Sequence, residues 1–334
     1  MNENPFLVDV GRGSIVESRH RGRYAVVDVD GGIVASTGDI DAPVFPRSAI
    51  KFLQGLPLVE SGAADSLRLG NAELAIACAS HGGEPRHVET VRAWLARAGL
   101  SEADLECGAH MPSTASAAEI LIRESRAPSA LHNNCSGKHA GMLSTCHHLG
   151  DTTRGYIEPD HPQQRRVLAV FEAMLRLDLA HAPRGTDGCS LPQIAVPLRA
   201  LAGGIARFGA PDALPPIRAQ ACRRLGAAIL AEPFMLAGTG RFCTRAIEAC
   251  GGMAIIKTGA EGVYVAAIPA LGLGIALKID DGAARAAEVA MGHLLLRHAA
   301  LGDAACRKLE AMITPSINNA AGRVVGGIAP APSW

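Results

Sequence analysis

The sequence is poor in aromatic residues and carries no excess of charge of either sign. Aromatic residues make up 4% of the 334 residues, and 32 basic residues balance 32 acidic ones. Nucleic acids are bound by basic surfaces and by aromatic rings on which bases stack, so no nucleic-acid partner is expected. A chain without net charge is equally poorly suited to an anionic membrane surface.

Long apolar runs are also missing. No stretch reaches the roughly 18 apolar residues that a membrane-spanning helix needs, so no membrane association is expected. The opening stretch, MNENPFLVDVGRG, lacks a basic segment followed by an apolar one, and the sequence therefore predicts no secretory signal. The nine cysteines lack the spacing of a disulfide framework, which favours reduced thiols in the cytoplasm.

Enough apolar residues remain for a substantial core. They make up 48% of the chain, against 19% charged residues, a balance typical of globular proteins. Residues 24–37, YAVVDVDGGIVAST, predict a hairpin that turns at Asp30-Gly31-Gly32. Three short apolar runs between residues 253 and 280 predict neighbouring antiparallel strands.

Between these regions the pattern is helical. Apolar residues recur at helical spacing in residues 84–99 and 161–178, and residues 281–302 predict one more helix that is apolar enough to pack on a sheet. We therefore expect an α/β (α+β) fold with an antiparallel sheet built from both chain ends and a largely helical middle.

No internal repeat or interdomain linker interrupts this pattern. We expect residues 1–334 to form a single catalytic unit. Its sheet part should take in about residues 1–45 and 250–334, and its mainly helical part about residues 46–249.

Lysine is scarce, which makes each of its positions informative. Only five of the 32 basic residues are lysine, and one of them forms the motif Ser48-x-x-Lys51. Arginine stays protonated at every accessible pH, whereas a lysine that is buried or beside another cation can lose its proton. On a helix the two side chains would share a face, so a neutral Lys51 could activate the Ser48 hydroxyl. The plainer alternative is a capping serine followed by a solvated lysine.

Two later motifs extend this pattern. Lys257-Thr258-Gly259 stands at the end of an apolar strand. An S-x-x-K motif followed by a K-T-G strand is typical of penicillin-binding proteins and class A β-lactamases. Ser80, in the segment CASHGG, offers a second hydroxyl. The alternatives are a turn with an edge-strand lysine at position 257 and a helix-capping serine at position 80.

The densest polar cluster is HNNCSGKHAGM, residues 132–142. It contains Cys135 and Lys138, and two further cysteines, Cys189 and Cys243, stand near turns. Zinc prefers thiolate and imidazole ligands, so these residues are candidates for a metal site. Their spacing does not follow the paired CxxC pattern, and buried free cysteines, which are common, are the alternative.

These motifs resemble those of the asparaginase II family, the rhizobial type of L-asparaginase. The matching stretches run from about residue 8 to about residue 328 and include PRSAIKFLQGLPL, ACASHGGEPRH, NNCSGKHAGML, GTDGCSLP and KTGAEGVY. The resemblance implies a fold similar to that of serine β-lactamases and glutaminases, and a homodimer. Together with the missing signal segment, it leads us to expect a cytoplasmic enzyme.

The resemblance also implies two Ser–Lys pairs in an active site that hydrolyses L-asparagine to L-aspartate and ammonia. Ser48 and Lys51 match the first pair, and Ser80 and Lys257 match the second. Ser48 is then expected to attack the side-chain amide while Lys51 accepts its proton. The second pair would relay a proton to the leaving ammonia.

A zinc site is implied close to these pairs. Cys135, Lys138 and Cys243 match its ligands, and Cys189 would lie near the metal or serve as an alternate ligand. An amine ligates a metal only when it is neutral, which explains why a lysine and not an arginine stands at this position. We expect the zinc to shape the substrate pocket and not to carry the chemical step.

Three further residues are candidates for binding the substrate. Arg47, beside the nucleophile, could hold the α-carboxylate through two hydrogen bonds, and Asp187 could accept hydrogen bonds from the α-ammonium group. Asn133 is the third candidate. Two alternatives remain open: another serine acyl-transfer amidohydrolase, such as a glutaminase, and a zinc-binding or amino-acid-binding protein without catalysis.

Overall fold

The computed structural model describes residues 3–332 and 334, and the chain divides into two compact units. The sheet unit consists of residues 1–49, 196–210 and 246–334. The helical unit consists of residues 50–195 and 211–245. None of the helices in the described part of the chain combines the length and the hydrophobicity needed to cross a bilayer.

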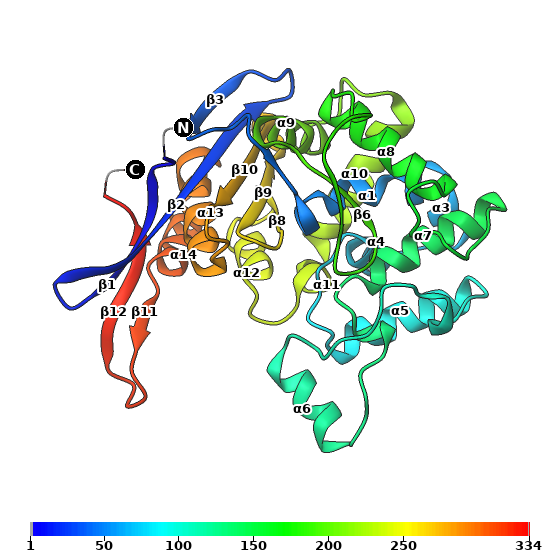
Figure 1. Cartoon of the computed structure of the whole chain (residues 1–334), viewed down its shortest axis with the longest axis horizontal. Coiled ribbons are helices and arrows are strands. Elements are labelled where there is room, and N and C mark those ends of the chain that lie inside the picture. The colour runs from blue at the N-terminus through cyan, green and yellow to red at the C-terminus, as the bar shows by residue number, and fades with distance from the viewer. Residues whose placement is uncertain (1–2, 333) are drawn as a thin grey trace. The chain divides into compact units, whose positions relative to one another are not determined.

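The sheet unit is built on antiparallel strands from the two ends of the chain. Strand order in the main sheet is β11-β12-β1-β2-β10-β9-β8, with β3 paired to β2. These strands are β1 (Phe6–Arg12), β2 (Ile15–Asp28), β3 (Ile33–Thr37), β8 (Ile255–Thr258), β9 (Val263–Ile268), β10 (Leu273–Ile279), β11 (Ser316–Asn318) and β12 (Val324–Pro330). In Figure 1 the blue β1 lies beside the red β12, and their register pairs Val8 with Pro330.

Helices α9 (Leu198–Gly209) and α13 (Ala284–His298) both pack against β9 and β10. The contact with α9 is close at Gly274 on β10, where an added Cβ would lie 2.0 Å from the Ala202 carbonyl oxygen. Only glycine fits there, because backbone atoms of α9 occupy the space of a side chain. The sheet unit also holds α14 (Asp303–Ile313), η4 (Pro269–Leu271) and a short pair of strands, β4 (Pro43–Val44) and β7 (Val196–Pro197).

The helical unit surrounds one buried helix, α7 (Ser136–Leu149), which packs against α2, α3, α4 and α5. The unit contains α1 (Lys51–Gln54), α2 (Leu56–Glu60), α3 (Ala63–Ser66), α4 (Asn71–Ala77), α5 (Pro85–Arg97), α6 (Ala115–Arg123), α8 (Pro162–Leu175), α10 (Pro216–Ala231), α11 (Pro233–Ala237), η2 (Glu102–Asp104), η3 (Ala130–His132), β5 (Arg184–Thr186) and β6 (Pro192–Ile194). Two elements cross the boundary between the units: η1 (Arg47–Ile50) and α12 (Phe242–Ala249).

Helix α7 can lie close to α4 because a glycine stands at its start. All of its side chains from Ser136 to Cys146 are buried. At Gly137 an added Cβ would lie 2.3 Å from the Ile76 carbonyl oxygen of α4, so glycine allows the two helices to touch through their backbones. This contact fixes the start of α7, which carries the polar cluster that the sequence singled out.

The expected fold class is confirmed. The structure is mixed α/β, with an antiparallel sheet from both chain ends and a helical middle. The hairpin at residues 24–37 appears as β2 and β3, and the three runs of residues 253–280 appear as β8, β9 and β10. The pattern did not reveal β5, β6 and β7, because strands of two or three residues bounded by proline are too short to show alternation.

The extent of the sheet unit differs from the expected one at residues 196–210, and the C-terminal tail forms a strand. Residues 196–210, which the sequence assigned to the helical part, cluster with the sheet unit because α9 packs on the strands. The C-terminal tail, which the sequence left without a role, forms β12. It ends with Trp334, whose ring centroid lies 5.6 Å from that of Tyr24 on β2. That the chain acts as a single catalytic unit stays a prediction.

Candidate active site

The centre of the candidate site is Lys51, the first residue of α1. Its side chain is fully buried. The Nζ atom donates to the Ala79 carbonyl oxygen at 2.5 Å, and it lies 3.0 Å from Ser80 Oγ and 3.1 Å from Cys135 Sγ. The amine thus contacts a carbonyl oxygen, a hydroxyl and a thiol. The contacts therefore suit a base that is shared between a hydroxyl and a thiol.

Ser80 is held by the loop that follows α4. Its backbone N–H donates to the Leu236 carbonyl oxygen at 3.0 Å, and the N–H of His81 donates to Asn134 at 3.2 Å. Gly83 next in this loop has a φ of +73°, and an added Cβ would lie 3.0 Å from the His132 carbonyl oxygen. Gly83 thus lets the Ser80 loop lie directly against the segment that leads to Cys135.

Glu84, at the end of this loop, forms hydrogen bonds with Thr239, which is far away in the sequence. Its carboxylate accepts hydrogen bonds from the Thr239 N–H at 2.8 Å and from the Thr239 hydroxyl at 2.6 Å. Gly238, with a φ of +115°, comes so close that an added Cβ would lie 2.4 Å from Glu84 Oε1. Residues 238–240 lead into α12, so Glu84 joins the Ser80 loop to the segment before Cys243.

Asn133 supports the turn that presents Cys135. Its side-chain oxygen accepts a hydrogen bond from the Cys135 N–H at 2.9 Å. Its amide nitrogen donates to the carbonyl oxygens of Cys107 at 2.7 Å and Gly108 at 3.1 Å. Both donors of this amide are therefore used by the backbone. A role in binding the substrate stays a prediction, and the contacts observed give Asn133 a supporting role.

Two buried histidines flank the start of α7. His81 Nε2 lies 2.9 Å from Ser136 Oγ, and its Nδ1 accepts a hydrogen bond from the Gly83 N–H at 3.2 Å. Burial, and then the nearby His87 and Lys51, hold the pKa of His81 well below its usual range. His81 is therefore neutral, with its proton on Nε2, and it ties the Ser80 loop to α7.

The second histidine, His139, lies one helical turn after Cys135. Its Nδ1 lies 2.7 Å from the Tyr156 hydroxyl, which in turn accepts a hydrogen bond from the Glu106 N–H at 2.9 Å. Burial, and then the charge of Lys138, lowers the pKa of His139 to about 3, so its ring is neutral. The sequence gave no signal for this contact, because Tyr156 lies on a separate loop.

Cys135, Lys138 and Cys189 form a buried cluster. Lys138 Nζ lies 3.1 Å from Cys189 Sγ, and a hydrogen bond joins the sulfur atoms of Cys189 and Cys135. Cys243, the third expected ligand, is buried near the start of α12. Cys189, which the sequence gave as an alternate ligand, thus contacts both Lys138 and Cys135.

The charges of this cluster are coupled. The hydrogen bond from Cys135, together with the positive charges of Lys138 and Lys51, lowers the pKa of Cys189 to about 4 in spite of its burial. The same hydrogen bond, and then burial, raises the pKa of Cys135 to about 12. Burial opposes the charge of Lys138, but the two cysteines prevail and raise its pKa. The cluster therefore favours one thiolate, shared between Cys189 and Cys135, beside a charged Lys138 amine.

Cys189 is presented by the turn between β5 and β6. Asp187 Oδ1 accepts a hydrogen bond from the Gly188 N–H at 2.9 Å, and Oδ2 accepts one from Gln193 at 3.3 Å. Ser190 has a φ of +71°, which is uncommon for a residue other than glycine. Such conformations cost energy and are found most often at functional sites. This turn brings Asp187 within 4.0 Å of Cys189 Sγ.

The remaining expected residues belong to the sheet unit. Ser48 is half-buried in η1, and Arg47 before it has a φ of +52°. Lys257 on β8 is buried, and its Nζ donates to the Thr258 carbonyl oxygen at 2.8 Å. At Gly259 an added Cβ would lie 2.6 Å from the Pro46 carbonyl oxygen. The K-T-G segment therefore packs against the turn that carries Ser48.

The described residues thus form two constellations. The helical unit brings together Lys51, Ser80, Cys135, Lys138 and Cys189. The sheet unit brings the K-T-G segment beside the turn of Arg47 and Ser48. Within the helical unit, Lys51 contacts Ser80. The expected pairing of Ser48 with Lys51 and of Ser80 with Lys257 stays a prediction.

Comparison with known proteins assigns the chain to a family. A search of curated proteins finds no match. Among solved structures, the chain is similar to a β-lactamase from Mycobacterium bovis, with 13% sequence identity, a TM-score of 0.41, and coverage of 84% of this chain and 95% of that chain. A likeness this low carries no argument about chemistry. The family described as L-asparaginase II, however, matches residues 8–330. This match spans both constellations, and the chain belongs to the L-asparaginase II family of hydrolases.

Proposed function

We propose that the protein is an L-asparaginase that hydrolyses the side-chain amide of L-asparagine to L-aspartate and ammonia through a serine acyl-enzyme. The observation that carries the proposal is the fully buried Lys51, whose Nζ lies 3.0 Å from the Ser80 hydroxyl. Membership of the L-asparaginase II family supports the choice of substrate. A buried lysine against a serine is the arrangement that Ser–Lys acyl-transfer chemistry needs.

Ser48 is the proposed nucleophile. It is half-buried, whereas Ser80 is only 6% exposed, so Ser48 is the hydroxyl that a substrate reaches more easily. The Ser48 oxygen attacks the amide carbon and its proton passes to Lys51. The C–N bond then breaks, and ammonia leaves with a proton relayed through Ser80 and Lys257. Water hydrolyses the resulting ester to aspartate and restores the serine.

The substrate is held by charged groups that the sequence proposed. Arg47 would bind the α-carboxylate, and its strained backbone, with a φ of +52°, fixes its position beside Ser48. Asp187 would accept hydrogen bonds from the α-ammonium group. Its loop is fixed by the β5–β6 pairing, which supports a positioned carboxylate. Asn133 would contribute to the pocket through the turn that it supports.

A zinc ion is the proposed cofactor. Within residues 3–332 and 334, no three side chains of histidine, cysteine, aspartate or glutamate are grouped so that they could hold a metal ion. A site completed by a lysine amine is a different case. Cys135, Cys189 and Lys138 are buried, and Cys189 contacts each of the other two. Two thiolates with an amine are a donor set that suits zinc. The residues present therefore fit the ion.

The zinc would be held by Cys135, Cys189 and Lys138, with Cys243 as a further candidate. When bound, it would supply a fixed positive charge that shapes the substrate pocket. Each ligand must be deprotonated, so binding releases protons from Cys135 and Lys138. The nucleophile and the base are already supplied by serine and lysine, which is why we assign the zinc to substrate binding. A cytoplasmic homodimer completes the proposal and rests on the family resemblance.

The deciding experiment is mass spectrometry of a trapped acyl-enzyme. The purified protein is incubated with L-asparagine or with a slowly deacylating analogue, quenched in acid and digested. A β-aspartyl adduct on Ser48, together with ammonia release from L-asparagine, supports the proposal. An adduct on Ser80 moves the nucleophile to that residue. Faster ammonia release from L-glutamine would make the protein a glutaminase, and binding without ammonia release would contradict an enzyme.

A further inference from the structure

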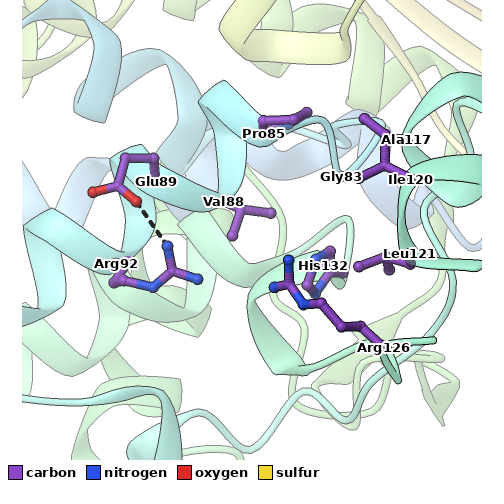
Figure 2. Close-up of a pocket in the computed structure, with 10 residues that line it drawn as sticks. All are labelled: Gly83, Pro85, Val88, Glu89, Arg92, Ala117, Ile120, Leu121, Arg126 and His132. Atoms are coloured by element: carbon purple, nitrogen blue, oxygen red, sulfur yellow. Dashed lines mark hydrogen bonds and ion pairs between the residues drawn. The ribbon is translucent and has the colours of Figure 1, made fainter. Parts of the chain in front are cut away.

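A cavity lies in the helical unit, between α5, α6 and the segment before Cys135. Its volume is about 230 Å³. Cavities of roughly 150 Å³ are large enough for benzene, so a small organic molecule fits here. Figure 2 shows the side chains that line it, which come from the two helices, from Arg126 after α6 and from His132 in η3. None of the candidate catalytic residues lines this cavity.

The floor of the cavity is apolar. Val88 of α5 and Ala117 and Leu121 of α6 are each less than 10% exposed and face the cavity. They come from two helices with an open space between them. Buried apolar walls around an open space favour the hydrocarbon part of a ligand, because its transfer from water is favourable.

His132 adds a polar group at the inner wall. Its ring is 6% exposed, and Nδ1 accepts a hydrogen bond from the Ser129 N–H at 3.0 Å. Burial lowers the pKa of His132, which favours the neutral ring, and because Nδ1 accepts a hydrogen bond the ring proton then lies on Nε2. Because His132 lines the cavity, this N–H can donate a hydrogen bond to a ligand oxygen there.

Two arginines provide the charge. Arg126 extends toward His132 in Figure 2, and the charges of Arg126 and Arg92 both act on the His132 ring. Arg92 pairs with Glu89 at 2.7 Å and Arg126 pairs with Glu124 at 2.7 Å, but both arginine side chains are more than half exposed. Exposed ion pairs contribute little, so either guanidinium group can turn to an anion in the cavity.

We propose that this cavity binds a small organic monocarboxylate with an apolar body, with its carboxylate on Arg92, Arg126 and His132 Nε2. Two guanidinium groups and the Glu89 carboxylate leave the lining with one net positive charge, which matches a monoanion. Glu89 would repel a more highly charged anion. A guanidinium group binds a carboxylate through paired hydrogen bonds, and the floor holds the hydrocarbon.

The cavity lies beside two segments that carry residues of the candidate active site. His132 is followed directly by the turn that presents Cys135, and Gly83 follows the loop that holds Ser80. The backbones of Gly83 and His132 touch, as the 3.0 Å approach of a Cβ at Gly83 shows. A ligand on His132 therefore contacts both segments that form the helical part of the site. The binding site itself is proposed independently of the activity.

The test is a calorimetric titration of the full-length protein with benzoate as the probe and benzamide as its neutral counterpart. We expect benzoate to bind with a dissociation constant on the order of 0.1–1 mM, as a ligand of this size allows. Benzamide should bind at least about tenfold more weakly, because it lacks the charge that the arginines recognise. Equal affinity for the two compounds, or no binding of benzoate, contradicts the proposal.

Variants then locate the site. Arg92→Gln and Arg126→Gln, both at exposed positions, should each weaken benzoate binding at least about fivefold, the loss expected for one charged hydrogen-bonding partner. Arg123→Gln is the matched control, since Arg123 is an exposed arginine of α6 that does not line the cavity. Filling the space with Ala117→Leu should also weaken binding, with thermal unfolding as the check that the variant folds.

Two further outcomes decide against the proposal. If Ser80→Ala abolishes benzoate binding while Arg92→Gln and Arg126→Gln do not, the probe binds at the candidate active site. If inorganic phosphate binds with the same dependence on the two arginines and benzoate does not, the ligand is not a carboxylate with an apolar body. Unchanged affinity in Ser80→Ala supports a separate site, whether or not the protein hydrolyses asparagine.

Discussion

Lys51 Nζ lies 3.0 Å from Ser80 Oγ, although the two residues are 29 positions apart in the chain. Both side chains are buried, and a backbone carbonyl and a thiol complete the contacts of the amine. An arginine could not take the chemical role of a base, because a guanidinium group cannot give up its proton. In this chain, where 27 of the 32 basic residues are arginine, the contact supports the proposal that Lys51 acts as a base.

Replacing Lys51 by arginine should therefore remove the base and keep the charge. We expect Lys51→Arg to lower kcat for ammonia release by about 10²-fold or more, the size of a lost general base. Lys308→Arg, at an exposed lysine, is the control and should keep full activity. Circular dichroism should show that both variants fold. Near-normal turnover in a folded Lys51→Arg protein would mean that the lysine acts only as a fixed charge.

Replacing Ser48 should remove the nucleophile. We expect Ser48→Ala to reduce turnover at least about 10³-fold, and the double variant with Lys51→Ala to lose little more, because residues that act as a unit are not additive. Steady-state ammonia release measures both. If Ser48→Ala keeps more than a few percent of the activity, the nucleophile is another residue, and the contact with Lys51 makes Ser80 the first candidate.

The metal proposal predicts about one zinc ion per chain in protein purified without chelators, since the three donors form one site. Cys189→Ala should lose the metal and raise KM more than it lowers kcat. Cys222→Ala, at another buried cysteine of the helical unit, is the control and should keep it. Elemental analysis and steady-state kinetics check both. Metal-free protein with a normal KM and a lost kcat would assign the zinc to catalysis, and protein without zinc would leave a cluster of buried thiols.

Gly137→Ala should disturb the start of α7. A Cβ at this position would lie 2.3 Å from the Ile76 carbonyl oxygen, so α4 and α7 must move apart. We expect a loss of about 1–3 kcal/mol in the free energy of unfolding, as for other overpacked positions. Gly302→Ala is the control, because nothing lies within 4 Å of the added atom. Urea unfolding measures both, and equal stability of the two variants would show that the helices adapt without cost.

His81 should make stability depend on pH. Its folded pKa is lowered because burial, and then His87 and Lys51, disfavour the charged ring. The unfolded chain therefore binds a proton that the folded chain does not, and the stability is present above the unfolded pKa of about 6.5 and is lost as the pH falls below it.

Urea unfolding at pH 7.5 and 5.5 should show this effect. The loss of unfolding free energy between the two values should be about 1 kcal/mol smaller in His81→Gln than in the unchanged protein. His147→Gln, at an exposed histidine of the same region, should leave the loss unchanged. An identical loss in His81→Gln and the unchanged protein would mean that another group accounts for the acid sensitivity.

The sequence by itself determined the fold class and the kinds of residues in the site. Alternating runs at both chain ends and helical spacing between them predict an antiparallel sheet and a helical middle, because these periods follow from local backbone geometry. The scarcity of lysine drew attention to Lys51, Lys138 and Lys257 for a chemical reason that needs no structure. The motifs were also specific enough to indicate the family, which the match to residues 8–330 confirms.

Only the tertiary structure decided which of these residues touch. The packing of α1 against the loop after α4 places Lys51 against Ser80 and Cys135, a contact that sequence spacing does not reveal. Cys189 joins Lys138 because a short hairpin between β5 and β6 carries it there, and hairpins of this length leave no periodic trace. The cavity at His132 depends on the distance between α5 and α6. Such contacts join segments far apart in the chain, and side-chain volumes and backbone hydrogen bonds in the folded state fix them.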